Sequence, residues 1–279
     1  MRNSKTYELV LTGLFTAIII VMALTPLGYI PLVVINATTI HIPVILGAIF
    51  LGPKKGGFLG GVFGITSLLK STLAPSSLSA FVFSPVIAVS TLAPVGAGAT
   101  ILIVLKSLFI PLVPRILIGV VPYYVYNGIK KLVSSEKKTS AVVVATVVGL
   151  FLGFGVYAFI NKISPDFNTV AKAVIAVVVA AAAIIFFLVV MKGNDAKSLG
   201  FITAGICGSL TNTLLVMGSI FLFYKEPYSE AVGVAADALL AMIGGIISFN
   251  GVVEAIVAAI IVYLVGIVLD KIKPAGQTA

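Results

Sequence analysis

The sequence has few charged residues and few residues able to form covalent or metal-bound links. Only 10% of its 279 residues are charged, and it has one cysteine and one histidine. A single cysteine, Cys207, excludes an internal disulfide and any cysteine-based metal site. Because Cys207 lies within an apolar run, we interpret it as a packing residue. We expect no metal and no cofactor.

The motifs of common catalytic and nucleotide-binding sites are also missing. The patterns GxxxxGK[ST], HExxH and GxSxG do not occur. The glycine-rich run at 56–64 follows no strand-like segment, so it is not a dinucleotide-binding fingerprint. We therefore expect no catalytic residues and no enzyme activity, and transport driven by ATP would need a partner protein.

Apolar residues dominate what remains. They make up 60% of the chain, and the mean hydropathy is +1.22, which is typical of an integral membrane protein. The net charge of +9 does not indicate nucleic-acid binding, because most of the cations lie in short turns between apolar runs. Residues 1–6 lead straight into an apolar run without a small-residue cleavage site, so we expect a first helix there and not a removable signal.

The apolar runs predict an all-α polytopic membrane protein, 1–279, with eight spans. These are 7–25, 38–51, 56–73, 110–129, 140–160, 170–191, 199–224 and 250–269. We expect an irregular loop at 26–37 and a re-entrant or short helix at 237–249. The segment 74–98 is consistent with a loop folded onto the outer mouth, which we prefer, and with part of an extra span. With eight spans, 12 of the 18 cations fall on the side of the N-terminus, which predicts that both termini are cytoplasmic.

Polar residues of several spans are predicted to lie at one depth. Counting from the cytoplasmic turns at about 1.5 Å per residue places them roughly 21 to 26 Å above the cytoplasmic ends. They are Thr38, Lys70, Arg115, Asn212 and Glu254. Charges within a membrane normally face a bundle interior or a wet cavity.

Two interpretations of this layer stay open. In the first, an outward-facing pocket binds a solute: Arg115 or Lys70 holds an anionic group, and neutral hydrogen bonds come from Thr38, Thr39, His41, Asn212 and Asn250. In the second, Arg115 and Glu254 neutralise one another as a structural ion pair. His41 is equally consistent with packing, and the two threonines with hydrogen bonds to carbonyls of their own helix.

A stripe of small residues begins at a basic turn. Gly56, Gly60 and Gly64 share one helix face, and Gly13 and Ala17 form a shorter pair of the same kind. In lipid, small residues at every fourth position let backbones approach closely. The stripe is consistent both with packing inside the chain and with a docking face for another protein.

Four short runs resemble a known family. His-Ile-Pro-Val-Ile at 41–45, followed by Leu-Gly-Pro at 51–53, is the most specific of them. The others are Val-Pro-Arg-Ile-Leu-Ile-Gly at 113–119, Gly-Ser-Leu-Thr-Asn-Thr at 208–213 and Asn-Gly-Val-Val-Glu-Ala at 250–255. In this order they resemble the substrate-binding (S) components of energy-coupling factor (ECF) transporters.

The resemblance implies a six-helix vitamin-binding protein of the bacterial cell membrane, formed here by 7–135 and 198–273. It implies partners as well: a transmembrane coupling subunit and two ATPases, with which the S component topples in the bilayer to deliver its solute. Docking motifs of the family match Gly13, Ala17, Gly56, Gly60 and Gly64, which favours docking for the stripe. The helical hairpin at 140–192 departs from the pattern and is interpreted as an insertion.

The overall pattern is most similar to pantothenate-type components. The expected ligand is a small anionic vitamin, with pantothenate the best candidate. The candidate ligand-binding residues are Asn36, Thr38, Thr39, His41, Lys70, Arg115, Asn212, Asn250 and Glu254.

Two other functions compete with this interpretation. An autonomous secondary transporter of a small organic anion would usually show an internal repeat and paired broken helices, and we find no convincing repeat. An intramembrane enzyme using Glu254 and His41 would need a reactive geometry that the sequence alone does not provide.

Overall fold

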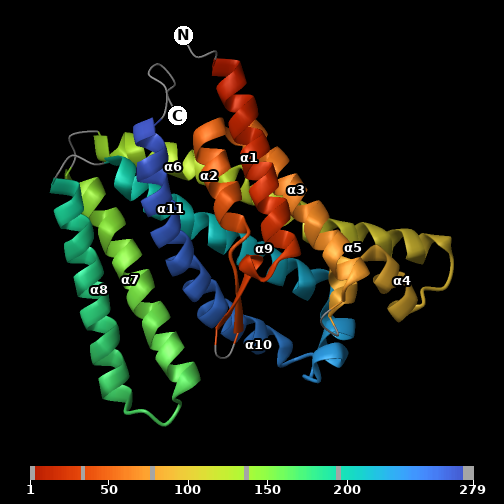
Figure 1. Cartoon of the computed structure of the whole chain (residues 1–279). Coiled ribbons are helices and arrows are strands. Elements are labelled where there is room, and N and C mark those ends of the chain that lie inside the picture. Colours follow the sequence, from red (N-terminus) through yellow and green to blue (C-terminus); the bar gives the residue numbers. More distant parts are fainter. Residues whose placement is uncertain (1–3, 33–34, 76–78, 135–137, 193–195, 273–279) are drawn as a thin grey trace.

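The protein is a bundle of helices with one small β-hairpin. The computed structural model describes residues 4–32, 35–75, 79–134, 138–192 and 196–272 (Figure 1). Its α-helices are α1 (Ser4–Leu24), α2 (His41–Leu51), α3 (Pro53–Leu73), α4 (Pro85–Leu92), α5 (Ala97–Ile118), α6 (Val121–Ser134), α7 (Lys138–Ile163), α8 (Thr169–Lys192), α9 (Ala196–Val232), α10 (Leu239–Ile246) and α11 (Val252–Ile272). Short 3₁₀ turns lie at η1 (Pro26–Gly28) and η2 (Ala80–Phe83), and a π-helical turn, η3 (Ile247–Gly251), joins α10 to α11.

Six stretches among the described residues are long and apolar enough to cross a membrane. They are 5–24, 97–133, 142–161, 169–189, 196–232 and 239–272. The shorter apolar helix α2 is buried over most of its length between its neighbours. The prediction of a helical, multi-pass membrane protein is therefore confirmed.

Two predicted boundaries are wrong. The span expected at 110–129 is part of a longer unit. Helix α5 starts at Ala97 and ends at Ile118, with Gly119 as its C-cap, and α6 begins at Val121. The segment 74–98, expected as a loop, contains η2 and α4. Ser84 starts α4 by accepting a hydrogen bond from the Ile87 amide, and Pro85 supplies the fixed φ that favours the first helical turn.

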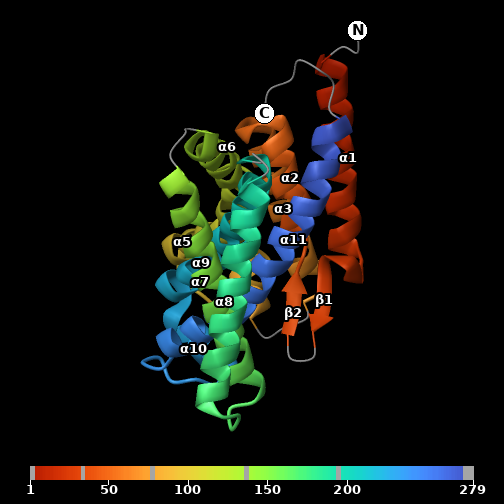
Figure 2. The ribbon, with the colours of Figure 1, turned by 90° about the vertical axis from the view of Figure 1, so that its left-hand side faces the viewer.

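The segment 26–37, expected to be irregular, forms a β-hairpin. Strand β1 (Tyr29–Leu32) pairs antiparallel with β2 (Ile35–Thr38), with Tyr29 opposite Thr38 (Figure 2). Thr39 fastens the base of the hairpin, because its amide donates to the Gly28 carbonyl at 3.0 Å and its hydroxyl to the Leu27 carbonyl at 2.6 Å. The hairpin places Thr38 beside α11, where it forms part of the site described below.

The glycine stripe of α3 packs inside the chain. A Cβ atom at Gly56 would overlap the Gly119 carbonyl oxygen, and one at Gly60 would overlap that of Arg115. At Gly64 it would lie 2.6 Å from the Pro111 carbonyl oxygen. The docking interpretation is therefore wrong for these three glycines, since α5 already covers them.

The second pair of small residues remains on the surface. Gly13 and Ala17 are both exposed on α1, and a Cβ atom at Gly13 would have no neighbour within 4 Å. The outer face of α1 also carries exposed Leu9, Leu14 and Val21. This face of α1 keeps the open, small-residue character that the stripe Gly56–Gly60–Gly64 lacks.

Several lysines gather at one end of the bundle. The start of α1 and the end of α11 lie together there (Figure 1). Lys55 of α3 pairs with Glu8 of α1, and Lys197 of α9 pairs with Asp270 of α11 at 2.6 Å. The ends of these four helices thus share one side of the molecule.

Candidate ligand-binding site

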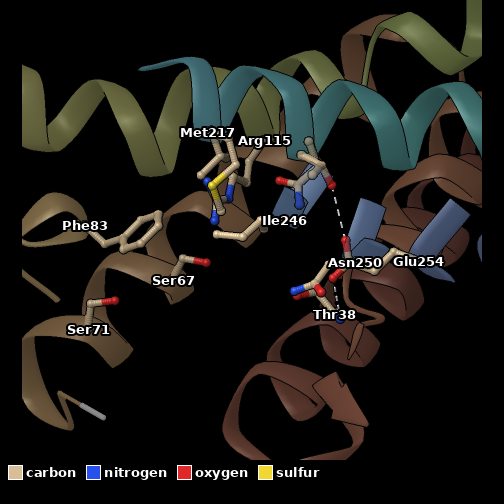
Figure 3. Close-up of a pocket in the computed structure, with 12 residues that line it drawn as sticks. Thr38, Ser67, Ser71, Phe83, Arg115, Met217, Ile246, Asn250 and Glu254 are labelled. Carbon is tan, nitrogen blue, oxygen red and sulfur yellow. Dashed lines mark hydrogen bonds between the residues drawn. The ribbon is translucent and has the colours of Figure 1, made fainter. Parts of the chain in front are cut away.

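A cavity of about 260 Å³ lies between the helices. Its volume is close to the lower end of the range for small-molecule sites, about 300–1,000 Å³. It is lined by Thr38, Ser67, Ser71, Phe83, Arg115, Asn212, Thr213, Val216, Met217, Ile246, Asn250 and Glu254. In Figure 3, Ser67, Ser71 and Phe83 lie toward one end and Thr38, Asn250 and Glu254 toward the other.

Arg115 reaches the cavity from the last turn of α5. Pro114 has no amide hydrogen, so the Ile110 carbonyl loses its usual helical donor. The Arg115 guanidinium donates to that carbonyl at 2.9 Å. It also lies over the rings of Phe63 and Phe83, with 5.3 and 5.5 Å from its central carbon to the ring centroids.

These contacts hold a cation in a site that is only 8% exposed. Aromatic faces attract a guanidinium. A guanidinium is also more weakly hydrated than an ammonium, so its burial loses less hydration free energy. A guanidinium has five donors in a planar fork, which matches the geometry of a carboxylate. Arg115 is therefore suited to bind an anionic group in the cavity.

Glu254 lies across the cavity on α11. One carboxylate oxygen accepts from the Thr38 backbone amide at 2.9 Å, and the other accepts from the Thr213 hydroxyl at 3.3 Å. These two bonds connect the β-hairpin, α9 and α11. Glu254 thus fixes three parts of the wall in addition to presenting a carboxylate to the cavity.

Two asparagines supply neutral polar groups. Asn250 belongs to the π-helical turn η3 and is one helical turn from Glu254. Asn212 of α9 is 8% exposed, and its Oδ1 atom has no hydrogen-bond partner within the described part of the chain. A buried acceptor of this kind favours a ligand that donates a hydrogen bond.

The structure brings together five of the predicted residues: Thr38, Arg115, Asn212, Asn250 and Glu254 line the same cavity. They meet because α5, α9, α11, the turn η3 and the β-hairpin converge here. The site residues that the sequence does not single out include Ser67 and Ser71, which continue the glycine stripe of α3 at helical spacing. That continuation is a signal in the sequence, whereas the placement of Phe83 and Met217 depends on tertiary packing.

The other predicted residues lie elsewhere. Thr39 fastens the hairpin, and Lys70 is absent from the cavity wall. His41 is fully buried at the start of α2 and does not line the cavity; neither ring nitrogen has a hydrogen-bond partner among the described residues. The side chain of Asn36 lies outside the described part of the structure.

Comparison of the sequence with known families gives a match over two blocks of the chain. The family model for the substrate-specific component of ECF transporters matches residues 8–104 and 164–266. Together these two blocks cover more than half of the chain. The chain belongs to this family. It is a membrane-embedded substrate-specific component with a transport role.

Two relatives of this substrate-specific component are named for pantothenate. The pantothenic acid transporter PanT of Lactococcus lactis subsp. cremoris is 34% identical over 163 residues, which are 55% of this chain and 78% of the relative. The pantothenate transporter PanT of Leuconostoc mesenteroides subsp. mesenteroides is 33% identical over 132 residues, 46% of this chain and 54% of the relative.

The family match does not follow the predicted limits of the hairpin insertion. It includes α8 and omits 105–163, which hold most of α5 together with α6 and α7. The α7–α8 hairpin itself is present as two antiparallel helices (Figure 2). Its status as an insertion at 140–192 stays a prediction.

Proposed function

We propose that this protein captures pantothenate, or a closely related small carboxylate, in the cavity beside Arg115 and passes it on for ATP-driven uptake. The observation that carries the proposal is a buried guanidinium on the wall of a polar cavity. The names of the two relatives support the choice of ligand.

The groups of pantothenate have counterparts in the cavity. Its carboxylate suits Arg115, and its amide and hydroxyl groups suit the Asn212 acceptor, Asn250 and the serines of α3. Its two methyl groups suit the apolar wall formed by Val216, Met217 and Ile246. The cavity wall holds one cation, several neutral polar groups and the Glu254 carboxylate, whose oxygens already accept from Thr38 and Thr213. Such a wall suits a small hydroxylated molecule with a carboxylate at the Arg115 end and donor groups elsewhere.

Identification of the bound molecule tests this proposal. Protein purified in mild detergent is analysed by native mass spectrometry before and after incubation with pantothenate. We expect a mass shift equal to one pantothenate. Absence of that shift, together with the mass of a different co-purified compound, would overturn the choice of ligand.

Uptake requires partners under this proposal. We infer a complex with a transmembrane coupling subunit and two ATPase subunits, because the matched family is a component of ECF transporters. The exposed face of α1 around Gly13 and Ala17 is the proposed contact, because backbone approach is open there. Uptake that persists in vesicles without any ATPase would instead favour a secondary transporter.

The docking face is tested by adding bulk to it. Ala17→Leu should weaken co-purification with the coupling subunit, because a larger side chain keeps the facing helix away. Pantothenate affinity should be unchanged, since Ala17 is exposed and does not line the cavity. The control is Leu24→Ala, at the exposed far end of α1. If Ala17→Leu and Leu24→Ala recover equal amounts of the complex, this contact is refuted.

A further inference from the structure

The α7–α8 hairpin contacts the part of the chain that carries Asn250. The ring of Phe159 in α7 stacks on that of Phe249 in η3, with centroids 5.2 Å apart and planes inclined by 9°. One turn earlier in α7, a Cβ atom at Gly155 would overlap Val252 at the start of α11. One face of α7 therefore packs on both the π-helical turn and the helix that follows it.

The turn η3 is itself part of the cavity wall. Ile246, Asn250 and Glu254 follow one another at four-residue spacing and all line the cavity. A π-helical turn is rare and holds one more residue than a regular helical turn. Relaxation to a regular helix would rotate the residues before the turn relative to those after it, by about 100° for each residue gained or lost.

The turn η3 is packed on two sides. On the side of α9, a Cβ atom at Gly251 would lie 3.2 Å from the Thr213 methyl carbon. On the side of α7, Phe159 is 37% exposed and covers Phe249, which is 4% exposed. Phe159 thus covers the turn from outside and is not among the residues that line the cavity.

We propose that α7 acts as a positioning element for the ligand cavity, in which Phe159 holds η3 in the conformation that directs Asn250 toward the ligand. The effect on ligand affinity rests on the proposed function. The effect on the conformation of η3 does not, so the two are measured separately.

The test compares two phenylalanines of the same helix. Phe159→Ala removes the stacked ring, whereas Phe154→Ala removes a ring that is 57% exposed. Hydrogen exchange of 246–252 is followed by mass spectrometry in the ligand-free protein, and pantothenate affinity by calorimetry. Phe159→Ala should accelerate exchange in this segment and weaken affinity about three- to ten-fold, and Phe154→Ala should change neither.

Two further variants keep the test decisive. Phe159→Leu retains apolar volume and folding if the alanine variant fails to fold, and it should show the same two effects at smaller size. Phe159→Tyr keeps the ring and should restore wild-type behaviour.

Each outcome decides one claim. Unchanged exchange at 246–252 in Phe159→Leu would overturn the role of α7, whatever the ligand. Faster exchange with unchanged pantothenate affinity would overturn its effect on binding. If the wild-type protein binds no pantothenate, the proposed function fails, while the exchange measurement still decides whether α7 holds η3.

Discussion

The Arg115 guanidinium donates to a backbone carbonyl that the preceding proline leaves without a helical donor. Pro114 leaves the Ile110 carbonyl without a helical donor, and the Arg115 side chain donates to it. The order Pro-Arg in one helix therefore both frees the acceptor and supplies the group that uses it. The rings of Phe63 and Phe83 complete the setting of the guanidinium.

Glu254 has a structural role that is separable from its charge. Glu254→Ala leaves the partly buried Thr38 amide without its acceptor, and we expect a loss of about 1–3 kcal/mol in the free energy of unfolding. Glu254→Gln keeps an oxygen that accepts the same bond, so it should lose less than half as much. Thermal unfolding in detergent measures both; equal losses would show that the charge, and not the hydrogen bond, stabilises the fold.

At the scale of elements, one face of α3 serves both packing and the site. Its glycines let the α5 backbone approach closely, and its next turns place Ser67 and Ser71 on the cavity wall. The backbone of Arg115 is the group that lies against Gly60. Close approach of α3 and α5 thus sets the position of the cation.

Adding a methyl group to this face tests that relation. Gly60→Ala places a Cβ atom against the Arg115 carbonyl, so we expect lower thermal stability and weaker pantothenate binding. Gly61→Ala is the matched control, because no atom lies within 4 Å of its Cβ position, and it should behave as wild type. Equal behaviour of the two variants would contradict the packing described for Gly60.

The sequence predicted the helices and the polar layer better than their connections. Long apolar runs predict most helices. A helix that crosses the lipid needs a long run of apolar side chains and satisfies its backbone hydrogen bonds internally. The β-hairpin before α2 and the π-turn at Asn250 depend on contacts with α11 and α7 that are distant in sequence. The stripe Gly56–Gly60–Gly64 predicts that another backbone approaches α3 closely. That this backbone belongs to α5 and its C-cap follows only from the tertiary structure.

At the scale of the whole molecule, the arrangement of helix ends supports the proposed topology. The six apolar stretches that are long enough to cross a membrane match six of the eight predicted spans, whereas α2 and α3 are not among them, so the count of eight stays a prediction. The lysines at the shared end of α1, α3, α9 and α11 would face the cytoplasm under the positive-inside rule. Both termini would then be cytoplasmic, and the α7–α8 turn would be outside.

Labelling of single cysteines tests this topology. In a Cys207→Ser background, Lys271→Cys should be protected from a membrane-impermeant maleimide in intact cells, and Ser164→Cys in the α7–α8 turn should react. Both positions are exposed, so access depends on the side of the membrane. The reverse labelling pattern would invert the proposed orientation, and labelling at both positions would contradict the number of spans between them.

The proposed binding of pantothenate is tested most directly by asking whether Arg115 recognises the carboxylate of the ligand. Calorimetry compares pantothenate with pantothenol, which has an alcohol in place of the carboxylate, for the wild-type protein and for Arg115→Ala. The wild-type protein should prefer pantothenate by about ten-fold or more, from hydrogen bonds to a charged group worth about 1.5–3 kcal/mol, and Arg115→Ala should lose this preference. Equal affinity of the wild-type protein for both compounds, or a preference that survives in Arg115→Ala, would contradict recognition of the carboxylate by Arg115.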